Sequence, residues 1–271
     1  MRTLFLIAGD SIRALLHRRL LLGLIVVSLA LTIVFSSYFS TRKADMNEAF
    51  MEQAAAESTD GKSQMSEADR RKFRESMEEA SFFFQTAFYF VASFGGSLVA
   101  LFIFSTAVTA EIRSGTIRLT LAKPVSRTQF LLGKYLGGVA VMAGYAVLAS
   151  GAMLAFVHSQ QMELSPGMTY APWLMFCKQL VLGSVALLLA MFVHPVVAAG
   201  IAFFAGNGFY SQRNPLYYVF PSYGDFDLYG EMLSGTLMSA SDVGWLTLYA
   251  ADFVAIMLLL ALWRFRTKEL V

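Results

Sequence analysis

Six long apolar runs dominate this sequence and limit what it can fold into. Most of the runs reach the about 20 residues that a helix needs to cross a hydrocarbon core about 30 Å thick. The chain is also 56% hydrophobic and only 15% charged, which is typical of a polytopic membrane protein and not of a soluble domain. We therefore predict an all-α fold, a single membrane domain over residues 1–271 with six transmembrane helices. The predicted spans are residues 20–39, 83–109, 130–157, 172–193, 195–211 and 243–263.

The positions of Lys and Arg predict how the chain is oriented in the lipid bilayer. Three segments fall on one side of six spans: the N-terminal arm, the 110–129 connection with the start of the third span, and the C-terminal tail. Together they carry 12 Lys and Arg against three Asp and Glu. Since segments rich in Lys and Arg stay on the cytoplasmic side, both termini are predicted to be cytoplasmic.

The N-terminal arm, residues 1–19, predicts an amphipathic elbow helix on the membrane surface. One half of its helical wheel carries Leu4, Phe5, Ile7, Ala8, Ile12, Leu15 and Leu16, with Leu6 as the exception. The alternative is that this helix extends the first span into water. A signal peptide is disfavoured, because Ser37-Tyr38-Phe39 is a poor cleavage site, and we expect an uncleaved span.

Two segments are predicted on the opposite, extracytoplasmic side. Residues 40–81 carry seven Lys and Arg and ten Asp and Glu, with apolar residues at helical spacing on both sides of the break at 58–61. This pattern predicts a helical hairpin, which is a gate, a docking surface for an external partner, or only a solvated connector. Residues 212–242 combine prolines, acids and interleaved aromatic residues. They predict either short helices that dip back toward the membrane or a plain external loop.

The most distinctive segment is the basic, turn-rich connection at 110–129 and the residues after it. It reads EIRSGTIRLTLAKPVSRTQFLLG from Glu111 to Gly133. Ser126-x-x-Gln129 is a capping-box pattern for the third span, and Pro124 favours a turn before it. Glu111 is predicted near the carboxyl end of the second span, where its charge opposes the helix dipole unless a cation such as Arg113, Arg118 or one from a partner answers it.

The sequence shows no recognisable catalytic, cofactor or metal motif, and we expect the chain not to be an enzyme. Gly133-Lys134 lacks the pattern of a phosphate-binding loop, and the three histidines have no ligand spacing. Nothing indicates a nucleic acid partner. Asp252 lies inside the sixth predicted span and Asn207 near the end of the fifth. Because an unpaired carboxylate in a membrane is costly, Asp252 and Asn207 are candidates for a translocation path, although each has a simpler structural explanation.

The motif EIRSGTIRLTLAKPVSRTQFLLGKYLG resembles the signature loop of the integral membrane permeases of type 2 ABC transporters. The six-span layout, the elbow helix and the LYYVFPSYGDFDLY segment extend this likeness to most of the chain. The hairpin at 40–81 departs from the most compact members. The resemblance implies an exporter permease in the cell inner (cytoplasmic) membrane. It also implies a second permease copy, identical or related, and two separate ABC ATPase subunits that carry ATP and Mg.

By this resemblance, the 110–129 loop contains the coupling helix on which the ATPases press. The coupling helix would comprise Glu111, Arg113, Gly115, Thr116, Ile117 and Arg118, and the third span would be fixed by Lys123, Pro124, Ser126 and Arg127. Two other functions stay open from the residues alone. One is a membrane anchor or sensor whose outer hairpin binds a partner, and the other is a secondary transporter that uses Asp252 as a proton site. The substrate is not indicated by the sequence.

Overall fold

The computed structural model describes residues 2–16, 67–113, 126–208 and 221–267, together with isolated helical residues between 22 and 48. All regular structure in these residues is helical, and none of them forms a strand, so the all-α prediction is confirmed for the described part of the chain. The α-helices are α1 Arg2–Leu16, α3 Glu67–Thr106, α4 Thr109–Arg113, α6 Arg127–Ser159, α7 Ala171–Ala190, α8 Pro195–Gly208, α9 Tyr229–Ser234 and α10 Ala240–Thr267. Two short 3-10 helices, η1 Pro166–Thr169 and η3 Tyr223–Phe226, lie between them.

Four stretches of helix are long and apolar enough to cross a membrane, and they match the second, third, fourth and sixth predicted spans. They are Arg74–Ile112, Arg127–Ser159, Ala171–Ala190 and Ala240–Thr267. The fifth predicted span is a shorter apolar helix, α8, whose 14 residues extend over about 21 Å and do not cross a 30 Å core alone. About half of the residues in the first predicted span, 20–39, are described, and these are helical; the others lie outside the described residues.

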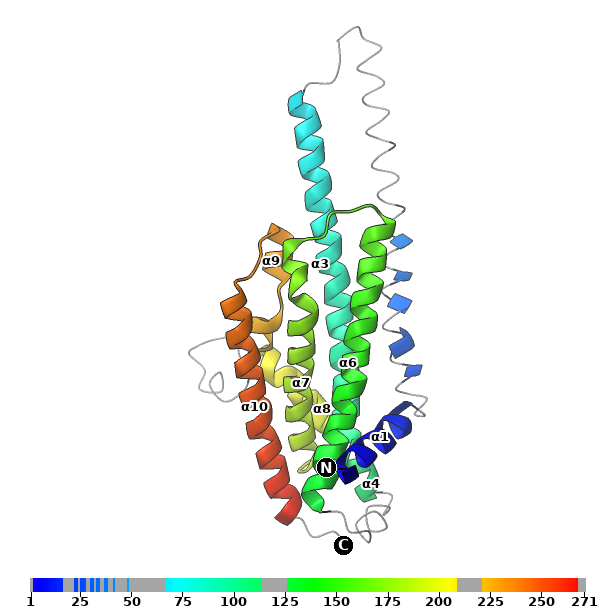
Figure 1. The fold of residues 1–271 in the computed structure, drawn as a ribbon, viewed down its shortest axis with the longest axis vertical. Coiled ribbons are helices and arrows are strands. Elements are labelled where there is room, and N and C mark those ends of the chain that lie inside the picture. The colour runs from blue at the N-terminus through cyan, green and yellow to red at the C-terminus, as the bar shows by residue number, and fades with distance from the viewer. Residues whose placement is uncertain are drawn as a thin grey trace.

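The helix α3 runs without a break for 40 residues, from the predicted outer hairpin through the second span. At about 1.5 Å per residue it is about 60 Å long, twice the thickness of a hydrocarbon core. The predicted hairpin ended at 81, and the predicted second span began at 83. The structure has one helix there, because no glycine or proline occurs between 67 and 94 to end it. Its first turns project well beyond the other described helices (Figure 1).

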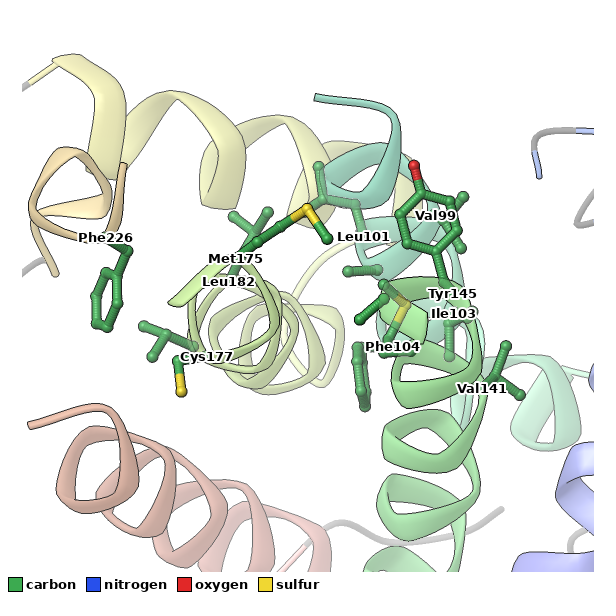
Figure 2. Packing of buried hydrophobic residues seen from close by; sticks show 14 of the residues in the cluster. Val99, Leu101, Ile103, Phe104, Val141, Tyr145, Met175, Cys177, Leu182 and Phe226 are labelled. Atoms are coloured by element: carbon green, nitrogen blue, oxygen red, sulfur yellow. The ribbon is translucent and has the colours of Figure 1, made fainter. Parts of the chain in front are cut away.

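The helix α7 occupies the centre of the bundle and contacts α3, α6, α8 and α10. Close packing around it depends on the ring of Phe104, a fully buried residue of α3. Figure 2 shows this ring in the space between α6 and α7. Gly138 of α6 and Gly183 of α7 both abut it, and a side chain at either glycine would collide with the ring. Small residues thus allow three helices to approach closely around one aromatic ring.

The N-terminal helix α1 packs against the first half of α6. Ala8, Ser11 and Leu15 are buried, whereas Asp10 and Arg13 are exposed, so the predicted amphipathic pattern is seen. The closest approach is at Gly137, where an added Cβ would lie 2.7 Å from the Ser11 Cβ. The buried face of α1 therefore rests on a protein helix. Its role as a membrane elbow stays a prediction.

Gly137, Gly144 and Gly151 recur every seven residues along α6, but only the first of them meets a neighbouring helix. Gly144 and Gly151 are exposed, and an added Cβ at either would meet nothing within 4 Å. The regular spacing therefore marks one face of α6 without making that face a single contact surface.

The segment after α8 contains two short helices, η3 and α9, within the predicted 212–242 region. Tyr223, Phe226, Leu228 and Met232 are buried there, and η3 and α9 contact α3, α7, α8 and η1. The Tyr223 hydroxyl donates a hydrogen bond to the Ala202 carbonyl of α8 at 3.1 Å. Residues 221–235 thus pack against the bundle and include two short helices, and their position relative to the membrane stays a prediction.

The start of α1 and the end of α10 lie at one end of the bundle (Figure 1). α1, α4, the start of α6 and the end of α10 meet there, and η1 and α9 lie toward the opposite end (Figure 1). A polar network closes that opposite end: the Gln85 side chain accepts a hydrogen bond from the Ser165 amide at 2.9 Å and donates one to the Glu163 carbonyl at 2.8 Å. The first end is called the inner end below, and its cytoplasmic location stays a prediction.

Candidate functional sites

Glu111 and Lys134 form an ion pair that joins α4 to α6 at the inner end. The chain turns at 107–108, and α4 then starts at Thr109, so that Glu111 lies in the first turn of a new helix. The expected conflict with the dipole of the second span therefore does not arise, because an acid in a first helical turn is favourable. The cation that the structure places against Glu111 is Lys134, a residue that the sequence analysis did not consider for this pairing.

Arg127, at the start of α6, binds the carboxyl end of α10. Its Nη1 donates hydrogen bonds to the carbonyls of Phe265 at 3.1 Å and of Arg266 at 3.0 Å. Arg266 in turn donates to the Thr128 hydroxyl at 2.8 Å. The last carbonyls of a helix have no partner within the helix, and arginine satisfies them here. Arg127 is thus a crosslink between the 110–129 connection and the last helix.

The predicted capping box at the start of α6 is confirmed. The Ser126 hydroxyl accepts a hydrogen bond from the Gln129 amide, and the Gln129 side chain accepts one from the Ser126 amide, both at 3.1 Å. These two bonds satisfy amides that would otherwise be unpaired at the helix start. The box fixes where the 110–129 connection ends and α6 begins.

Replacing Ser126 by alanine is expected to lower the free energy of unfolding by about 1 kcal/mol, the usual cost of removing an N-cap side chain. Ser126→Asp is the matched control, since aspartate also accepts the amide hydrogen bond and favours a helix start. Thermal unfolding of the detergent-purified protein measures both. Equal midpoints for the alanine and aspartate variants would contradict the role of the cap.

Several predicted coupling residues lie outside the described residues: Gly115, Thr116, Ile117, Arg118, Lys123 and Pro124. Arg113 is the last residue of α4, but its side chain is not among those described. The structure therefore brings together Glu111, Ser126 and Arg127 from the predicted set. These three residues lie with Lys134 and the end of α10. We call residues 109–113, 126–134 and 264–267 the inner-end cluster.

A cavity of about 530 Å³ lies among α3, α7, α8, η3 and α9. Most of its wall is aromatic, with rings from Phe90, Phe94, Phe203, Phe204, Tyr223 and Tyr229. Phe90, Phe94 and Phe204 are 53%, 46% and 70% exposed, so they form a rim at the bundle surface. The volume is within the range of about 300–1,000 Å³ that is common for small-molecule sites.

A buried ion pair between Lys178 and Asp227 forms the polar part of the cavity wall. The Lys178 Nζ lies 2.9 Å and 2.7 Å from the two carboxylate oxygens of Asp227, and 3.4 Å from the Ser93 hydroxyl. The two charged side chains are only 9% and 11% exposed. A buried charge needs a partner, so this pair ties α7 to the segment that follows η3.

Sequence reasoning missed this pair. Lys178 falls inside the fourth predicted span, 172–193, and the structure shows it buried and paired. A signal was present: a lysine inside a predicted span requires an acid, and the 212–242 segment supplies Asp225, Asp227 and Glu231. The sequence does not show which of these three acids pairs with Lys178.

Of the two predicted translocation-path residues, Asp252 is not among the described residues that line this cavity. Asp252 is exposed on α10. Asn207 belongs to the last turn of α8, and its side chain is not among those described. Their proposed role stays a prediction.

A comparison with protein-family models finds one that matches residues 7–212, described as an ABC-2 family transporter protein. The match covers most of the chain and includes residues 109–113 and 126–134 of the inner-end cluster, as well as the α3, α7 and α8 walls of the cavity. A comparison with curated proteins finds no match.

Proposed function

Because this chain belongs to the ABC-2 family of transporter proteins, we propose that it is the membrane-spanning permease subunit of an ATP-driven exporter. The chain lines the translocation path and performs no hydrolysis. ATP and Mg are bound by two ABC ATPase subunits, which are separate chains. A second permease copy, identical or related, completes the assembly in the inner membrane, with both termini of this chain in the cytoplasm.

The observation that carries this proposal is the construction of the inner-end cluster. The 110–129 connection begins within α4, and Glu111 of α4 is paired with Lys134 of α6. Arg127, near the end of the connection, binds the last carbonyls of α10. A partner that moves this connection therefore acts on three long helices at once. It acts on α3 through the adjoining α4, and it also acts on α6 and on α10. This arrangement supports an ATPase docking site formed by Glu111, Arg113, Gly115, Thr116, Ile117 and Arg118 and held in place by Lys123, Pro124, Ser126 and Arg127.

Reversing the Glu111–Lys134 pair tests this proposal. The Glu111→Lys and Lys134→Glu single variants place like charges together and are expected to lower the substrate-stimulated ATPase activity of the assembled transporter. The loss should be roughly 5- to 150-fold, the range that corresponds to a coupling free energy of about 1–3 kcal/mol. The Glu111→Lys/Lys134→Glu double variant restores the attraction and is the matched control. It should recover most of the activity.

The assembly itself is measured in the same preparations. The tagged chain is purified gently from its native host, and the ATPase subunit that accompanies it is quantified by mass spectrometry. A stoichiometric ATPase whose activity follows the single and double variants supports the proposal. A chain that purifies without an ATPase would contradict it and would favour the anchor or sensor function.

A further inference from the structure

We propose that the cavity among α3, α7, α8, η3 and α9 is a binding site for a hydrophobic organic cation, an amine whose N–H donates to Asp227 while aromatic rings surround its charge. This inference concerns binding by the chain itself and goes beyond the proposed function. It can be tested without an ATPase, so its failure is separate from the failure of the permease proposal.

The first argument is the hydrogen-bonding capacity of the ion pair. An ammonium group has three donors, and those of Lys178 are directed to the two Asp227 oxygens and the Ser93 hydroxyl. A carboxylate has about four acceptor positions, and Asp227 uses two for Lys178 and one for a long 3.5 Å contact from Ser93. The pair therefore offers a ligand an acceptor and no donor. A ligand at this wall must itself donate.

The second argument is the aromatic wall. The face of an aromatic ring carries negative potential and attracts cations within about 6 Å of its centre. Six rings from four elements line this cavity. The Phe94–Phe203 pair is edge to face at 6.0 Å, the Phe90–Tyr229 pair is tilted at 5.6 Å, and the Phe90–Phe94 pair is stacked at 6.4 Å. An anion would meet these ring faces and a lysine whose donors are already used. A ligand that donates a hydrogen bond to Asp227 meets a remaining acceptor position and the aromatic wall together.

The third argument is the location of the opening. Phe90 and Phe204 are exposed at the rim, and they belong to α3 and α8, helices that are apolar at this level. A molecule that reaches the cavity by this route must be hydrophobic over most of its surface. The cavity volume of about 530 Å³ admits a molecule larger than a simple alkylamine.

Dansylcadaverine is a suitable probe, because it joins a fluorescent aromatic body to a primary amine that is protonated at neutral pH. Its N-acetyl derivative has the same body without the charge, and dansyl-6-aminohexanoic acid carries a carboxylate instead. Fluorescence titration of the full-length protein in detergent should show saturable binding of the amine at least tenfold tighter than binding of either control. Equal binding of the three probes, or tighter binding of the acid, would overturn the proposal.

Variants locate the site. Lys178→Met/Asp227→Leu removes both charges together, so neither is left buried alone, and it should abolish the preference for the amine over its acetylated form. Phe204→Ala should weaken amine binding several-fold by removing a rim aromatic. Trp245→Ala is the matched control, because Trp245 is a 72% exposed aromatic on α10 outside the cavity wall. A preference that persists in the double variant, or equal losses for Phe204→Ala and Trp245→Ala, would place the binding elsewhere.

Discussion

Replacing Lys178 alone by methionine, or Asp227 alone by leucine, is expected to destabilise the protein by about 3–5 kcal/mol, whereas the double variant should regain most of that stability. Each single change leaves one charge buried without its partner. The double change leaves an apolar contact in place of the pair, and such replacements are often neutral or even stabilising.

Thermal unfolding of the purified protein in one detergent compares the three variants with the original chain. The double-mutant cycle then gives the coupling between the two residues. Losses that simply add in the double variant would show that Lys178 and Asp227 do not interact. Single variants as stable as the original chain would show that neither charge is buried in the folded protein.

Replacing Gly183 by alanine should destabilise the bundle by about 1–3 kcal/mol, the usual cost of adding a methyl group to a packed core. An added Cβ collides with the Phe104 ring, which is also confined by Gly138 on the other side. Because Phe104 is fully buried, its ring cannot move away without displacing α6 or α7.

Gly144→Ala is the matched control, since Gly144 is an interior residue of α6 with nothing within 4 Å of an added Cβ. Alanine favours a helix over glycine by about 1 kcal/mol, so this variant should be as stable as the original chain or more stable. The two midpoints of thermal unfolding decide the question. A Gly183→Ala variant as stable as Gly144→Ala would contradict the close packing around Phe104.

The sequence predicted the helical class and the four longest spans because these depend on local properties: the length of an apolar run and the residues that end it. The capping box at Ser126 was predictable for the same reason, since all its atoms lie within one helical turn. The turn at His194-Pro195 also follows from a local rule, because proline is tolerated in the first turn of a helix, and α8 begins at Pro195.

The partners of the charged residues could not be predicted, because they come from distant parts of the chain. Lys178 and Asp227 are separated by 49 positions, and Arg127 and Phe265 by 138. Composition shows that Lys178 needs an acid, but only the packing of η3 beside α7 selects Asp227. In the same way, periodicity placed Gly137, Gly144 and Gly151 on one face of α6, while the position of α1 determined that only Gly137 is covered.

The unbroken helix α3 has a mechanical consequence. About three quarters of the way along it, Gly96 lies so close to α7 and α6 that an added Cβ would overlap the Gln179 amide and lie 2.6 Å from the Tyr145 ring. Such a tight contact is a pivot around which a rigid helix of about 60 Å would tilt. The arm from Gly96 to Glu67 is about 44 Å long and the arm from Gly96 to Thr106 about 15 Å, so a tilt of about 10° around this point moves the Glu67 tip by roughly 8 Å and the Thr106 tip by roughly 3 Å in the opposite direction. A small displacement at Thr106 would thus be transmitted along the helix and move Glu67 at its other end. No other element is needed between the two residues.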